Sequence, residues 1–195
     1  FLRFFYADLA QGLRFRGLAP LIHSGESKVS LLRVALTSEA ATEKTRITDG
    51  CKLFSTSGLA AVKSGAISIY AYCGANGQEG NGGHCHNDRN SFVVFSNGRE
   101  VLVDPGTGFY TAEPKKRNLF RSTSMHNTVS VNRAEQNRFC SKKGLFSCVQ
   151  DVRNPSLNLS GLTHGDVKIT GRHDGYKARF GIEHERHWRI SGGLN

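Results

Sequence analysis

The chain has 195 residues, 22 of them glycine, and a formal net charge of +10. No apolar run approaches the roughly 18 residues of a membrane-spanning helix. Neither a recognition helix nor a zinc-finger or RNP-like spacing is present, so nucleic acid ranks below other polyanions as a partner. A positive field of this size raises the local concentration of polyanions, which include anionic membranes and acidic polysaccharides, and it indicates only the sign of the partner's charge.

Residues 1–46 carry a helical pattern. Apolar residues recur there at spacings near 3.6, namely Phe5, Leu9, Leu13, Val29, Leu32 and Leu36. Two or three helices fit this segment, with glycine and proline between them. The chain opens without an initiator Met or a signal-peptide pattern and stops just after an apparent strand, so we expect a piece of a longer protein.

From about residue 50 onward, the pattern changes to short β-type runs. Glycine, serine and asparagine separate these runs, as strand reversals require. We expect strands at residues 59–63, 66–72, 91–95, 100–103, 127–131, 145–149, 167–170 and 184–190. The fold is therefore predicted to be mainly β and antiparallel, behind a short helical N-terminal segment.

An Asn-Gly turn at residues 97–98 predicts a tight hairpin between the runs on either side, because both central turn positions need positive φ. The returning strand brings Asp104 near the start of the first strand, where His86 lies. His126 directly precedes the next predicted strand. We therefore expect these three side chains at strand ends along one edge of one sheet.

A glycine-rich loop leads into His-Cys-His-Asn-Asp at residues 84–88. Ordinary polar loop residues are one interpretation. The spacing also fits the H-x-H-x-D of metallo-β-lactamase-like hydrolases, although Arg89 stands where that motif has a further histidine. A third interpretation is an iron oxygenase site formed by His86, Asp88 and His126.

The fourth interpretation takes His86, Asp104 and His126 as ligands of a divalent ion, most simply zinc. Two imidazoles and one carboxylate leave the fourth zinc position to water. Such an ion can polarise a carbonyl or hold the sheet edge rigid. The spacing alone does not choose among the four interpretations.

The five cysteines are odd in number and lack C-x-x-C spacing, so they predict neither a disulfide framework nor a thiolate zinc site. Cys85 lies between the two histidines of the H-x-H sequence. Because neighbouring side chains alternate along an extended segment, we expect Cys85 to point to the opposite face.

A more specific pattern emerges when residues 82–139 are taken as one block. In order, it contains Gly-Gly-His-Cys-His-Asn-Asp, Ser-Phe, Asn-Gly-Arg-Glu-Val-Leu-Val-Asp-Pro-Gly, Phe-Arg-Ser-Thr-Ser-Met-His-Asn-Thr-Val and Glu-Gln-Asn-Arg-Phe. This string resembles the heparinase II/III-like family of polysaccharide lyases, which includes alginate lyases. His-Asp-Gly-Tyr at 173–176, followed by Gly181 and His184-Glu-Arg, is similar to a further stretch of that family, so the resemblance covers roughly residues 50–190.

The resemblance implies an (α/α) toroid followed by a large antiparallel β-sandwich, with the substrate cleft between them. Residues 1–46 would be the tail of the toroid, and residues 47–195 the first part of the sandwich, truncated at its C-terminus. The activity it implies is β-elimination on a uronate-containing polysaccharide such as heparan, heparin or alginate. This reaction needs a neutralised carboxylate, a base and an acid.

The resemblance also assigns roles to residues. It implies zinc, or another divalent ion, on His86, Asp104 and His126, and it places His84 beside the substrate carboxylate as the catalytic candidate of this chain. The main catalytic Tyr and His of the family belong to the toroid upstream, so the isolated chain is expected to be inactive or nearly so.

Three further residues are candidates for substrate binding: Asn87, Arg121 and Tyr110. For Asn87 a turn-stabilising role is the alternative, and for Arg121 an internal ion pair. A non-catalytic glycan-binding or polysaccharide-biosynthesis accessory protein with a structural metal is the main alternative function. A hydrolase or oxygenase using His84, His86 and Asp88 is the second. A polysaccharide substrate implies a periplasmic or secreted protein, and the sequence leaves the oligomeric state open.

Overall fold

The computed structural model describes residues 49–140, 144–161 and 166–191. The chain divides into two units, Phe1–Ile47 and Thr48–Asn195, and all described residues belong to the second unit. The helices and the toroid tail predicted for residues 1–46 lie outside the described residues.

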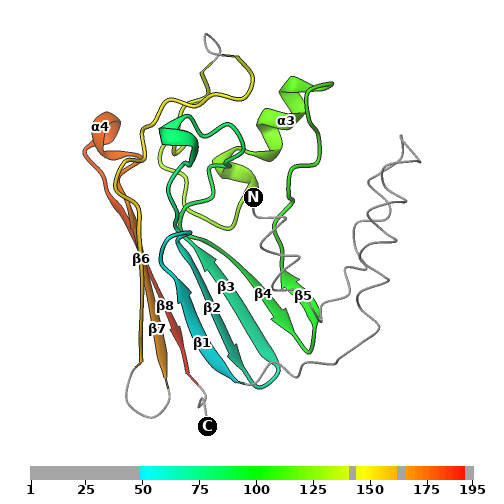
Figure 1. The fold of residues 1–195 in the computed structure, drawn as a ribbon, viewed down its shortest axis with the longest axis vertical. Coiled ribbons are helices and arrows are strands. Elements are labelled where there is room, and N and C mark those ends of the chain that lie inside the picture. The colour runs from blue at the N-terminus through cyan, green and yellow to red at the C-terminus, as the bar shows by residue number, and fades with distance from the viewer. Residues whose placement is uncertain (1–48, 141–143, 162–165, 192–195) are drawn as a thin grey trace. The chain divides into compact units, whose positions relative to one another are not determined.

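The first sheet is an antiparallel meander in which each strand pairs with the next one in sequence (Figure 1). Its strands are β1 (Gly50–Phe54), β2 (Leu59–Ser64), β3 (Ile67–Tyr72), β4 (Ser91–Ser96) and β5 (Arg99–Leu102). The predicted strands at 59–63 and 66–72 and the predicted hairpin are confirmed.

The turn between β4 and β5 has the geometry that its sequence requires. Asn97 has φ 51° and Gly98 has φ 72°, which are the left-handed values that an Asn-Gly hairpin turn supplies. The pairing register shifts between Val94 and Phe95, and such a bulge bends the strand locally. The hairpin returns the chain toward the start of β4, as predicted.

The second sheet contains β6 (Ser156–Gly161), β7 (Val167–His173) and β8 (His184–Ile190), again antiparallel and in sequence order. The predicted strands at 167–170 and 184–190 are confirmed, whereas β6 was missed. The two sheets share one apolar core, to which the first contributes Ala60, Val62, Ala71 and Cys73 and the second Leu157, Val167, Ile169 and Trp188. The predicted antiparallel β-sandwich is therefore confirmed.

Two predicted strands, at 127–131 and 145–149, are wrong. The structure has only isolated bridges there, Val131 to Ala134 and Phe139 to Cys148. In the segment at 127–131, side chains from other parts of the chain form hydrogen bonds with backbone groups that a strand would use for pairing. For example, the hydroxyl of Tyr176 donates to the carbonyl of Val129 at 2.9 Å.

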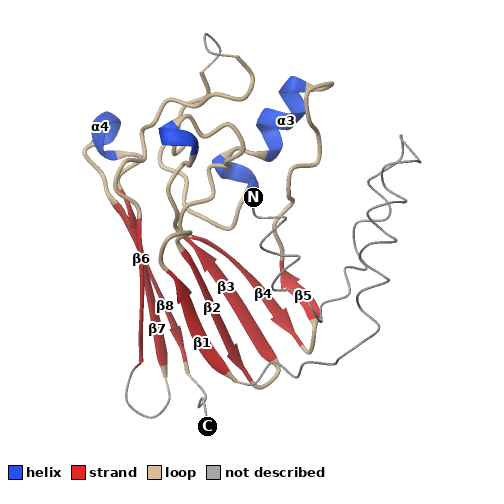
Figure 2. Cartoon of the chain, viewed as in Figure 1, coloured by secondary structure: helices blue, strands red, loops and turns tan. Residues whose placement is uncertain are grey.

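The longer connections between strands gather beyond one end of the two sheets, where the short helices also lie (Figure 2). These helices are η2 (Gln78–Gly80), α3 (Pro114–Phe120), η3 (Thr123–Met125) and α4 (Lys177–Phe180). In the described parts of the chain, no helix has the length and apolar character needed to cross a membrane. The candidate site is built from these connecting segments.

Candidate functional site

His86, Asp104 and His126 come together, and we call them the imidazole–carboxylate cluster. Nδ1 of His126 lies 2.6 Å from Oδ2 of Asp104, and the rings of His86 and His126 are 5.2 Å apart between centroids. The predicted proximity is therefore present. The predicted placement at three strand ends is wrong for His126, which follows η3 and precedes no strand.

Asn127 explains why His126 reaches Asp104 without a strand. The Asn127 side-chain amide donates to the carbonyl of Phe92 in β4, at 3.0 Å, and to that of Val103 just after β5, at 2.9 Å. One side chain thus fastens the segment that carries His126 to both strands of the hairpin. Asn127 is not among the site residues predicted from the sequence.

The pKa of each residue in the cluster depends on burial and on the charges of its neighbours. Burial and the neighbouring charge of His126 lower the pKa of His86 to about 3. For His126, burial acts in the same direction, but the hydrogen bond to Asp104 and the charge of Asp88 outweigh it and raise the pKa. For Asp104, burial acts to raise the pKa, and the bond from His126 more than offsets it. Asp104 therefore favours the charged form of His126, whereas burial favours the neutral form of His86.

By donor type, the cluster fits a divalent ion, since two imidazoles and a carboxylate suit zinc. Nε2 of His126 is buried and has no hydrogen-bond partner among the described residues. The Asp104 carboxylate is bonded to His126, however, and no three His, Cys, Asp or Glu side chains in the described ranges are grouped closely enough to share an ion as they stand. Zinc binding by all three residues requires that this hydrogen bond be exchanged for a bond to the ion.

His84 is exposed and lies against two aromatic rings, which a buried arginine contacts in turn; we call these four residues, His84, Tyr110, Phe146 and Arg117, the His84 platform. Nδ1 of His84 is 3.0 Å from the hydroxyl of Tyr110, whose side chain is 47% exposed. Phe146 lies 6.0 Å from the ring of His84 and 5.2 Å from that of Tyr110. The guanidinium of Arg117 is 4.3 Å from the Phe146 centroid. Two of the predicted residues, His84 and Tyr110, are thus neighbours, and Phe146 and Arg117 were missed.

Asn87 and Arg121 lie together in the interior, with 1% exposure each. The backbone N–H of Asn87 donates to the carbonyl of Arg121 at 2.9 Å. The Asn87 amide donates to Glu135 at 2.7 Å and to the carbonyl of Asn137 at 2.9 Å, and the Arg121 guanidinium contacts the sulfur of Cys148. Substrate binding by Asn87 and Arg121 stays a prediction, and the structure gives both residues internal contacts.

Arg89 is the centre of a buried polar network beneath the cluster. Its side chain is fully buried and donates to the carbonyl of Gly74 at 3.0 Å, to the side chain of Asn76 at 2.8 Å and to the carbonyl of His86. The side-chain oxygen of Gln136 accepts from the backbone N–H of Arg89 at 2.9 Å. The residues at 135–138 were quoted from the sequence only as part of the family-like block, and Arg89 was assigned no structural role there.

Asp88 is also buried, and its carboxylate lies 3.5 Å from Nη1 of Arg89. Burial raises the pKa of Asp88 to about 6, with Arg89 and His126 acting in the opposite direction. Asp88 is thus placed beside Arg89, whereas Asp104 is the carboxylate that contacts His126.

The second family-like stretch, from His173 to Arg186, lies behind the site and contributes no predicted site residue to it. Arg186 of β8 donates to the carbonyls of Asn90 and Asn127, at 2.8 Å and 2.7 Å. His173 is fully buried, with Nε2 3.1 Å from Nδ1 of His184. The second sheet thus anchors the segments next to His86 and His126.

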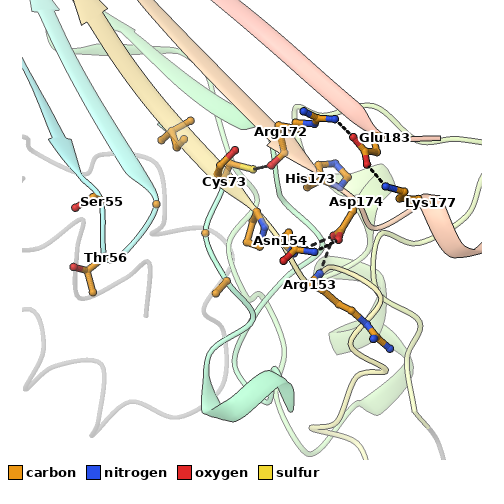
Figure 3. A pocket seen from close by; sticks show the side chains of 16 residues that line it. Ser55, Thr56, Cys73, Arg153, Asn154, Arg172, His173, Asp174, Lys177 and Glu183 are labelled. Carbon is orange, nitrogen blue, oxygen red and sulfur yellow. Dashed lines mark hydrogen bonds and ion pairs between the residues drawn. The ribbon is translucent and has the colours of Figure 1, made fainter. Parts of the chain in front are cut away.

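A pocket of about 830 Å³ opens between the β1–β2 turn and the ends of β6 and β7 (Figure 3). None of the predicted site residues lines it. Among its lining residues, Glu183 accepts from both Arg172 and Lys177, and Asp174 accepts from the side chain of Asn154 at 2.8 Å. The pocket is therefore separate from the histidine site.

His173 and His184 are held neutral in the folded protein. The backbone N–H of Gly175 donates to Nδ1 of His173 at 3.3 Å, so Nε2 of His173 carries the proton and donates to His184. Burial, together with the charge of His184, lowers the pKa of His173 to about 3. Burial and the charge of Arg186 lower that of His184 to about 4.

Folding stability is therefore expected to fall as the pH is lowered from about 7 to 4. In the unfolded chain these imidazoles bind protons near their ordinary pKa of 6.5, whereas in the folded chain they bind protons only near pH 3 to 4. Between these values the unfolded chain binds more protons, so acid favours unfolding. Urea unfolding at several pH values should show that His173→Gln flattens this dependence by about 1.4 kcal/mol per pH unit. His187→Gln, at an exposed position of β8, is the control. An unchanged slope in His173→Gln would contradict the prediction.

These features define a β-sandwich domain that carries a loop-built histidine site at one end of its sheets. The chain belongs to the family described as Heparinase II/III-like, C-terminal, whose profile matches residues 46–193. A search of curated protein sequences gives no match.

Solved structures show the same fold. Heparinase III is 18% identical, with a TM-score of 0.55, over 73% of this chain and 20% of that one. The heparan sulfate lyase HepC from Pedobacter heparinus is 20% identical, with a TM-score of 0.55, over 83% of this chain and 24% of that one. The chain therefore spans about a quarter or less of the length of these enzymes.

Proposed function

We propose that the protein is a polysaccharide lyase that cleaves a uronate-containing chain by β-elimination, and that this chain supplies one wall of its cleft. The His84 platform carries the proposal. It places an exposed imidazole, a phenol and a guanidinium side by side, directly next to a buried imidazole–carboxylate cluster, in a chain of the heparinase II/III-like family.

The groups of the platform match the needs of the reaction. His84 can hydrogen-bond the uronate carboxylate and so favour removal of the adjacent proton. The Tyr110 hydroxyl orients the His84 ring through Nδ1, and the exposed Tyr110 ring offers a face on which a sugar can stack. Arg117 adds positive charge next to these rings. The base and acid that complete the elimination are assigned to the part of the cleft beyond this chain.

The direct test is a panel of heparan sulfate, heparin, alginate and hyaluronan, incubated with the full-length protein. Lyase action creates an unsaturated uronate, which is detected by its ultraviolet absorbance. Binding to one of these polymers without any unsaturated product would instead identify the non-catalytic glycan-binding protein.

We further propose that His86, Asp104 and His126 hold zinc. When bound, the ion supplies a fixed positive charge at the floor of the cleft. His86 already has the neutral state that a ligand needs. Because the proposed substrate is a polysaccharide, we also propose that the protein is periplasmic or secreted.

Metal analysis of purified variants is expected to separate the two candidate carboxylates. Asp104→Ala and His126→Ala should lose bound zinc, because each removes one of only three protein ligands. Asp88→Asn should keep it. Circular dichroism shows whether each variant remains folded. Loss of zinc from Asp88→Asn, with retention in Asp104→Ala, would favour the hydrolase or oxygenase assignment instead.

A further inference from the structure

Two of the five cysteines, Cys85 and Cys148, meet beside the site. All five are free thiols, and the side chains of these two lie against the same residue, Gly82. Cys85 lies between His84 and His86, in a turn that places its sulfur 3.2 Å from the carbonyl of Gly82.

The backbone holds the two cysteines in place from the same short segment. The N–H of Cys148 donates to the carbonyl of Asn81 at 2.9 Å, and the N–H of Cys85 donates to that of Gly82 at 3.2 Å. A side-chain carbon on Gly82 would lie 2.6 Å from the Cys85 sulfur and 3.6 Å from Cβ of Cys148. The two cysteine side chains therefore lie against Gly82, and the Cys85 sulfur leaves no room for a side chain at that position.

Other contacts already join the segments that carry these cysteines. The guanidinium of Arg117 donates to the carbonyl of Gly83 at 2.8 Å and to that of Leu145 at 3.1 Å. The ring of His84 contacts that of Phe146. A disulfide between the two cysteines would thus link two segments, around residues 83–85 and 145–148, that are already in contact.

The two thiols differ in access. Cys148 is 7% exposed and is covered by the guanidinium of Arg121, which itself lies 4.6 Å from the Phe139 ring. Cys85 is only partly buried. An oxidant therefore reaches Cys85 first, and Cys148 is placed to react with the product.

We propose that Cys85 and Cys148 are a redox-active pair, which a small-molecule disulfide such as oxidised glutathione converts into an intramolecular disulfide. The Cys85 sulfur attacks one glutathione sulfur, breaks the glutathione disulfide and releases one glutathione thiol. The Cys148 sulfur then attacks the Cys85 sulfur of the mixed disulfide and releases the second. The two cysteines lose two protons and two electrons, and the oxidant is reduced to two thiols.

The consequence concerns the H-x-H sequence. The disulfide fixes the backbone between His84 and His86 to the segment before Val149, so the His84 platform and the cluster are held in one arrangement. The pairing concerns the thiols alone and does not depend on the proposed lyase activity.

The test is incubation of the protein with oxidised glutathione, followed by thiol counting and non-reducing peptide mapping. We expect the loss of two of the five thiols, a cross-linked pair of peptides containing Cys85 and Cys148, and a mass lower by about 2 units. Cys148→Ser should stop at the mixed disulfide on Cys85. Cys51→Ser, which alters an exposed thiol on β1, should form the cross-link as the unchanged protein does.

The proposal is overturned if the cross-link joins other cysteines, or if all five thiols survive under conditions that oxidise a denatured control. It is also overturned if Cys148→Ser forms an intramolecular disulfide at Cys85 with another cysteine as readily as the unchanged protein forms its own.

Discussion

Replacing Arg89 by Met is expected to reduce the free energy of unfolding by about 3–5 kcal/mol, because it removes one partner of a buried charge pair and leaves the other. Arg89 is fully buried. Its loss leaves the carbonyl of Gly74 without this donor, removes one of two donors to the side-chain oxygen of Asn76, and leaves the Asp88 carboxylate without the cation beside it. Urea unfolding measures the change, and the thermal midpoint should fall by roughly 10 °C.

Two variants show whether the buried charge is the cause. Arg99→Met removes an exposed arginine from β5 and should change stability by less than about 0.5 kcal/mol. The double variant Asp88→Asn with Arg89→Met should recover part of the loss, because the unpaired carboxylate is gone. Equal stability of the Arg89→Met and Arg99→Met proteins would show that the network around Arg89 contributes nothing.

Replacing His84 by Ala is expected to lower kcat for the unsaturated product by about 10²-fold or more, the usual effect of removing a group that stabilises developing charge. His84 is exposed, and the side-chain contacts given for it by the described residues are those of the platform, so the urea midpoint should change little. The measurement is the initial rate of ultraviolet absorbance increase with the full-length protein and its best polysaccharide.

The controls for this prediction use the same kind of side chain and the same neighbour. His187→Ala removes an exposed imidazole from β8 and should keep full activity. Tyr110→Phe removes only the hydroxyl that orients His84, so a smaller fall in kcat is expected. Full activity in His84→Ala would assign the chemistry entirely to groups outside this chain.

The sequence was sufficient for the elements whose signals are local. Asn97 and Gly98 determine their turn through backbone conformation alone, and the flanking apolar runs supply the two strands of the hairpin. The proximity of Asp104 to the start of β4 follows from that hairpin. The family also follows from the sequence, because an ordered string of motifs needs no tertiary information.

The segment at 127–131 shows where local signals fail. Its alternation of apolar and polar residues is typical of a strand, yet its polar groups bond to other parts of the chain. The hydroxyl of Thr128 donates to the carbonyl of Arg89 at 2.6 Å, and Arg186 of the second sheet donates to the carbonyl of Asn127. Tertiary hydrogen bonds therefore override the strand preference of the segment.

What the sequence determined by itself is the set of reactive groups: His84, His86, Asp104 and His126, in a β-sandwich of one family. Only the tertiary structure decided how they divide, with His84 exposed beside Tyr110 and with the partly exposed Asp104 paired to the buried His126. The physical reason is that burial and hydrogen bonding depend on residues distant in sequence, such as Asn127 and Arg89, whose type alone does not reveal what they contact.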